Sequence, residues 1–161
     1  LLQIQVVESL HVTEASEIFR VLLDNLEYCV KVVFSYKGNE PGFADDGRDL
    51  CQYRCESQAY QVLHAHGVCE LGIIPYFYGI FESFDPDLLG SALESFKGDP
   101  TPPCAILLEY LRDATSFEKA SLSSEAIDMA VNGLKIIHGA HVVHNDAYPT
   151  KKKNPYRPGS Y

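Results

Sequence analysis

The sequence has no tryptophan, a single methionine and few basic residues. Lys and Arg number 13 against 22 Asp and Glu, which gives a net charge of −9 and argues against a nucleic-acid partner. No run approaches the roughly 18 apolar residues that a membrane helix needs, so we expect no membrane partner. No basic start followed by an apolar segment resembles a secretion signal.

Cysteines are too few and too scattered to form a disulfide framework. There are five, an odd number, which favours a reducing location inside the cell, most simply the cytoplasm. Cys51 and Cys55 lie near His64 and His66, but these spacings match no familiar zinc motif. The sequence therefore predicts core thiols and no metal site.

The 161 residues, 46% of them apolar, can bury a substantial core. Three strands are predicted in the first third, with a turn at Asp24-Asn25 that makes a hairpin of the second and third. A helix over 48–66 follows, ended by Gly67. Its apolar face is expected to contain Cys55, Ala59, Val62 and Leu63. The three strands are expected at Ile4–Glu8, Glu17–Leu23 and Glu27–Phe34.

Two further strands and a second helix are predicted after that helix. The strands are expected at Ile73–Phe81 and Cys104–Leu111, joined by the acidic connection Phe84–Pro103. The middle of this connection, Leu88–Phe96, favours a short helix. The last helix begins at a cap, Ser123 or Ser124, and ends at Gly139. The order of elements indicates an α+β fold.

Three residue patterns carry the chemistry of the chain. Lys31 lies in the strand segment Tyr28-Cys29-Val30-Lys31, and Glu56 lies on the following helix. His144-Asn145-Asp146 follows the second helix, with Pro149 three residues on. In this order they resemble the protein-kinase pattern of a strand lysine, its glutamate partner on a helix and a His-Arg-Asp loop. The resemblance covers about residues 4–149, and its ancestral type is a Ser/Thr protein kinase.

The resemblance implies a kinase N-terminal lobe, a five-stranded antiparallel sheet plus one helix, and a hinge over 1–111. An incomplete C-terminal lobe would cover 112–150, and a basic, disordered tail 151–161. ATP is the implied nucleotide, and phosphoryl transfer to protein Ser or Thr the ancestral activity. The implied catalytic residues are Lys31, Glu56 and Asp146. The implied cofactor-binding residues are Ile18, Cys29, Lys31, Glu109 and Leu111.

The chain departs from the kinase pattern where phosphates and magnesium would bind. No glycine lies between Leu1 and Gly38, so His11, Thr13 and Ser16 stand where a glycine-rich loop is expected. Lys151 occupies the place of a magnesium-binding Asn, and no Asp-Phe-Gly occurs. Because Mg²⁺ neutralises the phosphate charge during transfer, we expect weak or no catalysis from this chain.

Two other functions fit the same residues. His-Asn-Asp also fits a small-molecule kinase of the aminoglycoside or choline type. A non-catalytic interaction module would instead use the acidic connection Phe84–Pro103 and the basic tail. We also expect self-association, because Ile136, Ile137 and Val142 would lie on an apolar surface without its usual neighbours.

Overall fold

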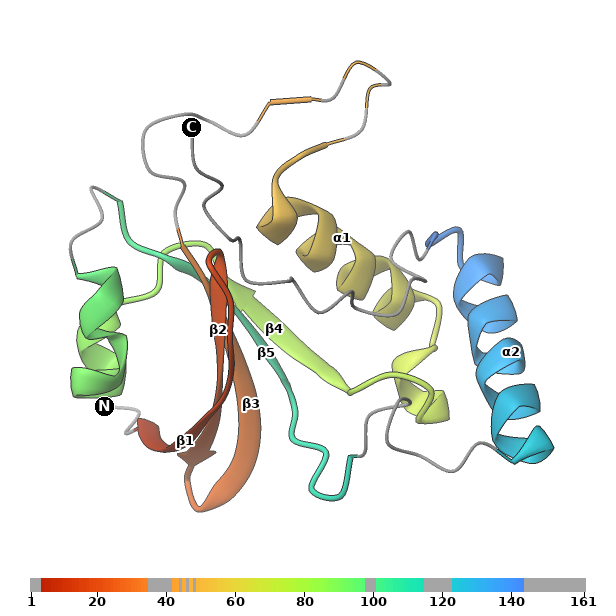
Figure 1. Cartoon of the computed structure of the whole chain (residues 1–161), viewed down its shortest axis with the longest axis horizontal. Helices are drawn as coiled ribbons and strands as arrows, with labels where there is room; N and C mark the ends of the chain where they lie inside the picture. The colour runs from red at the N-terminus through yellow and green to blue at the C-terminus, as the bar shows by residue number, and fades with distance from the viewer. Residues whose placement is uncertain are drawn as a thin grey trace, which may run out of the picture. The chain divides into compact units, whose positions relative to one another are not determined.

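The computed structural model describes residues 4–34, 42–43, 45, 47, 49–97, 101–114 and 123–143. These residues form an α+β fold with a five-stranded sheet, as expected (Figure 1). The strands are β1 (Ile4–Val12), β2 (Ser16–Leu23), β3 (Leu26–Val33), β4 (Phe77–Phe81) and β5 (Cys104–Glu109). The helices are α1 (Gln52–Ala65), α2 (Ser124–Gly139) and two 3₁₀ segments, η1 (Cys69–Leu71) and η2 (Pro86–Phe96).

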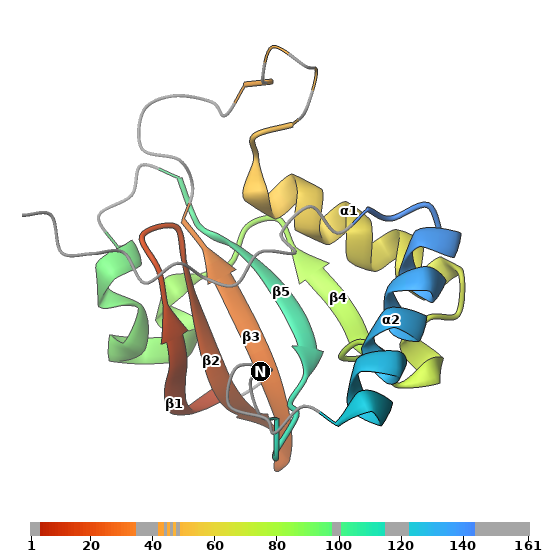
Figure 2. The same ribbon diagram turned by 45° about the vertical axis from the view of Figure 1, so that its right-hand side comes forward.

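The sheet is antiparallel throughout, in the order β1-β2-β3-β5-β4 (Figure 2). Asp24 and Asn25 form the tight turn between β2 and β3, with φ values of 50° and 64°. Both angles lie in the left-handed region, which two-residue hairpin turns require and which Asp and Asn tolerate. The turn sets the register of the hairpin and places Ile18 directly opposite Lys31.

Two strand boundaries differ by four residues from those expected, and the other boundaries differ by at most two. β1 runs to Val12 instead of ending at Glu8, because its outer half also pairs with β2. β4 begins at Phe77 instead of Ile73. Pro75 has no N–H for a ladder, and the N–H of Tyr76 donates to the Glu109 side chain at 3.0 Å.

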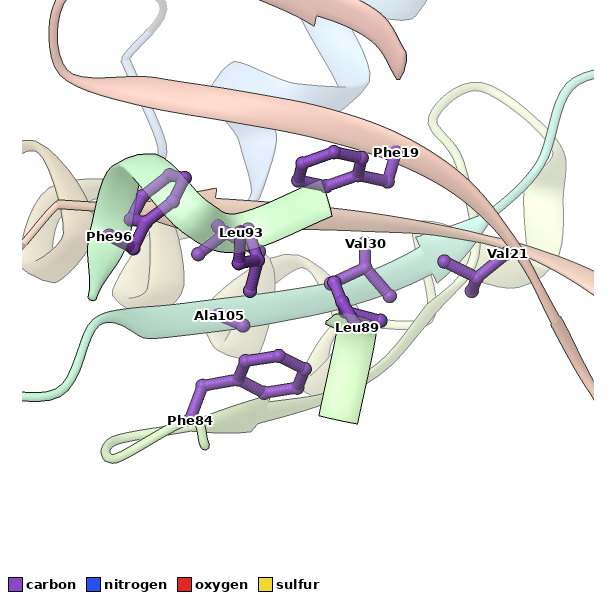
Figure 3. Close-up of a cluster of buried hydrophobic side chains, with 9 residues drawn as sticks. Phe19, Val21, Val30, Phe84, Leu89, Leu93, Phe96 and Ala105 are labelled. Atoms are coloured by element: carbon purple, nitrogen blue, oxygen red, sulfur yellow. The ribbon is translucent and has the colours of Figure 1, made fainter. Parts of the chain in front are cut away.

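One face of the sheet is covered by η2, which lies on the side away from α1 (Figures 1 and 2). The short helix expected in the connection Phe84–Pro103 is therefore part of the core. Leu93 and Phe96 of η2, with Phe84 just before it, are almost completely buried against β2, β3 and β5 (Figure 3). The strand residues of this cluster are Phe19, Val21, Val30, Val32 and Ala105.

The other face of the sheet packs against α1 through Phe77, Ile106 and Leu108. The helix face expected from the sequence is right for Ala59 and Leu63, which are half-buried and buried, and wrong for Cys55 and Val62, which are exposed. The inward side also contains Glu56, Ser57 and Tyr60, which are buried or half-buried. Two contacts turn α1 away from the expected orientation: the ion pair made by Glu56 and the stacking of Tyr60 on Phe77.

The chain divides into two compact units, Leu1–Asp113 and Ala114–Tyr161. In the second unit, α2 begins as expected with Ser123, whose Oγ accepts from the Ala126 N–H at 3.2 Å. Ile136 is exposed as expected, whereas Ile137 and Val142 are half-buried. Within the described residues, no helix combines the length and apolar character needed to cross a membrane.

Candidate functional site

Lys31 and Glu56 form an ion pair between the centre of the sheet and α1. Lys31 Nζ donates to Glu56 Oε2 at 2.5 Å, and the two side chains are 13% and 26% exposed. β3 places Lys31 on the α1 face, and α1 brings Glu56 over it, 25 residues later in the sequence. Because both charges are largely withdrawn from water, each needs the other as its partner. The pair holds a cationic side chain on the sheet face that α1 covers.

Two of the expected cofactor-binding residues lie beside Lys31 on the same sheet face. Ile18 is its direct cross-strand neighbour on β2, and Cys29 lies two residues earlier on β3. Cys29 packs among the apolar side chains under α1. Burial raises the pKa of its thiol to about 11, and the positive charge of Lys31 opposes this shift in part. Cys29 is therefore a neutral, apolar group at neutral pH.

Aromatic side chains pack between α1 and β4 next to the ion pair, and the sequence reasoning did not assign them to the site. Tyr60 stacks on Phe77, with ring centroids 5.7 Å apart and an interplanar angle of 13°. Burial raises the pKa of Tyr60. Tyr53, one turn before Glu56, donates from its hydroxyl to the Phe81 carbonyl at 3.3 Å. These contacts fix α1 against β4 and so fix the position of Glu56.

Glu109 and Leu111, expected at the hinge, are arranged differently from Ile18 and Cys29. The Glu109 side chain lies opposite Tyr28 in the register, so it faces away from Cys29. Its carboxylate accepts from the Tyr76 N–H, and its own N–H donates to the Tyr76 carbonyl at 2.8 Å. Leu111 is 46% exposed. A ligand on the α1 face could therefore meet Glu109 only through its backbone.

The turn between β1 and β2 is stabilised by hydrogen bonds among its own residues. Thr13 Oγ1 accepts from the N–H groups of Ala15 and Ser16 at 3.2 and 2.9 Å. The Thr13 N–H donates to the Ser16 carbonyl at 2.8 Å. The amides that a glycine-rich loop would turn toward phosphates are thus used inside the turn.

A network of charges lies on the sheet face that carries Lys31, at the end where β3 begins and β5 ends, and the sequence reasoning missed it. Glu27 accepts from Arg20 Nε at 2.8 Å and from Arg112 Nε at 3.2 Å. Arg20 also pairs with Glu8 at 2.9 Å and lies 4.9 Å from the centre of the Tyr110 ring. Hydrogen bonds from Arg112 and Arg20 lower the pKa of the Glu27 carboxyl. The Asp24-Asn25 turn implies that Arg20 and Glu27 lie near each other, but no local signal brings in Arg112.

The third expected catalytic residue, Asp146, lies outside the described residues, as do His144 and the basic tail. Among the described residues, no group of three or more His, Cys, Asp or Glu side chains is placed to hold a metal ion. A scan against protein-family models and a search of curated proteins found no match to this chain. The case for a functional site therefore rests on the geometry around Lys31.

Proposed function

We propose that the chain is a nucleotide-binding module of the protein-kinase-like type, with ATP as its ligand and little or no phosphoryl transfer. The observation that carries the proposal is the Lys31–Glu56 ion pair between the third strand and the helix that follows it. An ammonium group held in this way can meet the phosphates of a nucleotide. Ile18 and Cys29, beside it, offer an apolar surface to a base.

Weak catalysis is proposed for two reasons. The Thr13–Ser16 turn uses its own amides and offers them to no phosphate. The sequence also has Lys151 where the kinase pattern has a magnesium-binding Asn, and it has no Asp-Phe-Gly. In this proposal Asp146 would accept the proton of a hydroxyl substrate, and the metal that supports the transfer would have to be held without these two ligands.

The test is a binding titration of the purified chain with ATP and with adenosine, each with and without Mg²⁺. We expect Lys31→Ala to weaken ATP binding by about tenfold or more and to leave adenosine binding nearly unchanged, because Lys31 would contact only phosphates. Glu56→Gln should weaken ATP binding in the same direction. Thermal melting of each variant establishes that it is folded, and ATP should raise the melting temperature of the parent chain.

Lys97→Ala is the matched control, since Lys97 is also an ion-paired lysine but directly follows η2, which covers the opposite face of the sheet. Equal ATP binding by the parent chain and by folded Lys31→Ala would contradict the proposal. That result would favour a non-catalytic interaction module. Phosphorylation of free alcohols but not of peptides would favour a small-molecule kinase.

A further inference from the structure

A cavity of about 370 Å³ lies at the end of the sheet where β3 begins and β5 ends. This volume is within the range of small ligand-binding sites. Three neighbouring strands contribute to its walls. Leu26 and Tyr28 come from β3, Tyr78 from β4 and Glu109 from β5. Lys31 does not line the cavity, which is therefore separate from the Lys31–Glu56 pair.

The side chains of these four residues lie on one face of the sheet. Tyr28 and Glu109 are directly opposite each other in the β3–β5 register, so their side chains are neighbours on the same face. Leu26 is two residues from Tyr28 on β3 and shares its face. The Tyr78 ring contacts the Tyr28 ring, with centroids 5.1 Å apart and an interplanar angle of 81°. Strand alternation places this face opposite the one that carries Lys31.

Glu109 gives the cavity a negative charge. Its Oε2 accepts from the Tyr76 N–H at 3.0 Å, and among the described residues none donates to its Oε1 or forms an ion pair with it. Arg112 also lines the cavity, but its guanidinium is bonded to Glu27. The charge network around Glu27 contains two arginines and two glutamates, so it is neutral as a whole. The cavity therefore attracts a cation through Glu109.

A tyrosine ring beside a carboxylate is suited to a guanidinium group. The ring face attracts a cation, and the carboxylate accepts from the planar N–H groups of arginine. The chain uses the same combination on its other face, where Arg20 lies 4.9 Å from the centre of the Tyr110 ring and donates to Glu27 at 2.8 Å. Tyr78 is 50% exposed, so a ligand can reach its ring from solvent.

We propose that this cavity binds an arginine side chain presented by a partner protein. The guanidinium lies against the Tyr78 ring and donates to the Glu109 carboxylate, and the aliphatic part of the side chain lies toward Leu26. A free amino acid would also need a cation for its α-carboxylate, and Arg112 is already bonded to Glu27. This function is independent of the nucleotide site.

The test is a titration of the isotope-labelled full chain with N-acetyl-arginine amide, followed by NMR. We expect saturable shifts that are largest at Tyr28, Tyr78 and Glu109. The citrulline analogue has the same shape without the charge, and it should bind at least about fivefold more weakly. The lysine analogue should also bind more weakly, because an ammonium group lacks the planar fork. Free arginine should bind no more tightly than the capped form.

Variants locate the binding. Glu109→Gln keeps an oxygen for the Tyr76 N–H and removes the charge, so it should fold and weaken binding by about fivefold. Tyr78→Leu should weaken binding as well, whereas Tyr78→Phe, which keeps the ring, should bind nearly like the parent chain. Glu82→Gln is the matched control, since Glu82 is an exposed glutamate just after β4 that does not line the cavity. Lys31→Ala should have no effect.

Any of three results would overturn the proposal. The first is the absence of saturable shifts when the arginine analogue is added to the folded parent chain. The second is binding of the citrulline or the lysine analogue as tight as that of arginine, which would mean that the guanidinium is not what the cavity recognises. The third is unchanged binding by Glu109→Gln or by Tyr78→Leu after thermal melting has established that the variant is folded.

Discussion

Asp49 stabilises the start of α1 through hydrogen bonds to Cys51 and Arg54. Its Oδ1 accepts from the Cys51 N–H at 2.8 Å, and its Oδ2 accepts from Arg54 Nε at 2.6 Å. Cys51, at the N-cap position, provides no side-chain cap of its own. Asp49 thus satisfies a backbone donor next to the first turn and binds a side chain within it. This anchoring matters for function, because α1 carries Glu56.

The pKa of Asp49 predicts acid sensitivity of the fold. The hydrogen bonds from Arg54 and Cys51 lower this pKa to about 2 from its ordinary value of 3.8. Because the pKa of Asp49 is lower in the folded protein than in the unfolded chain, its carboxylate stabilises the fold at pH values above about 3.8. This stabilisation is lost as the pH falls toward about 2. Asp49→Asn should therefore be less stable than the parent chain at pH 6, with the difference shrinking between about pH 4 and pH 2. Urea unfolding across this range measures the difference.

The control for this experiment is Asp128→Asn, which removes an exposed carboxylate from α2. It should shift the stability little at any of these pH values. If the deficit of Asp49→Asn were as large at pH 2 as at pH 6, the assignment of the lowered pKa to Asp49 would be wrong.

Among the elements, η2 has the largest structural role that its sequence does not suggest. It comes from an acidic connection, yet Leu93 is completely buried while Leu88, five residues earlier, is 40% exposed. Leu93→Ala should lower the free energy of unfolding by about 2–5 kcal/mol, because it removes buried methyl groups and leaves a cavity. Leu88→Ala should lower the free energy of unfolding much less, because Leu88 is already partly exposed. Equal effects in urea unfolding would mean that η2 is only loosely attached to the sheet.

A glycine divides η2 into two parts. Gly90 has φ 59° and ψ −133°, a combination that side-chain-bearing residues rarely adopt. Gly90→Ala should destabilise the fold by about 1–3 kcal/mol through backbone strain, although the added Cβ would meet no atom within 4 Å. The control is Gly139→Ala at the end of α2, where the added Cβ also has open space and φ is not positive. A neutral Gly90→Ala in thermal melting would contradict the strained geometry.

For the whole molecule, the most prominent feature is the apolar surface of α2. None of its residues is buried, and Met129 is 70% exposed. The other exposed apolar side chains of this helix are Ile127, Val131, Leu134 and Ile136. An apolar surface of this kind promotes association, because contact removes it from water.

We therefore predict concentration-dependent self-association in sedimentation velocity. Met129→Glu combined with Ile136→Glu should shift the chain toward the monomer, because a charge opposes burial of the surface. Leu71→Glu is the control, since Leu71 is 60% exposed but belongs to η1. A parent chain that stays monomeric at every concentration would refute the prediction.

The sequence by itself determined the features that depend on local geometry. The Asp24-Asn25 turn sets a two-residue hairpin, and the register that follows places Ile18 opposite Lys31. Strand alternation then puts Cys29 and Lys31 on one face. The pairing of Lys31 with Glu56 could be anticipated from the kinase-like order of the residues, whereas the nucleotide site built around the pair remains a proposal.

Only the tertiary structure decided which surfaces meet. The period of α1 allows several faces, and the one that turns inward is selected by Lys31 and Phe77, which are distant in sequence. The acidic connection becomes a core element because the second face of the sheet also has to be withdrawn from water. Arg112 joins Glu27 across 85 residues. Such contacts depend on packing between elements, which no local period encodes.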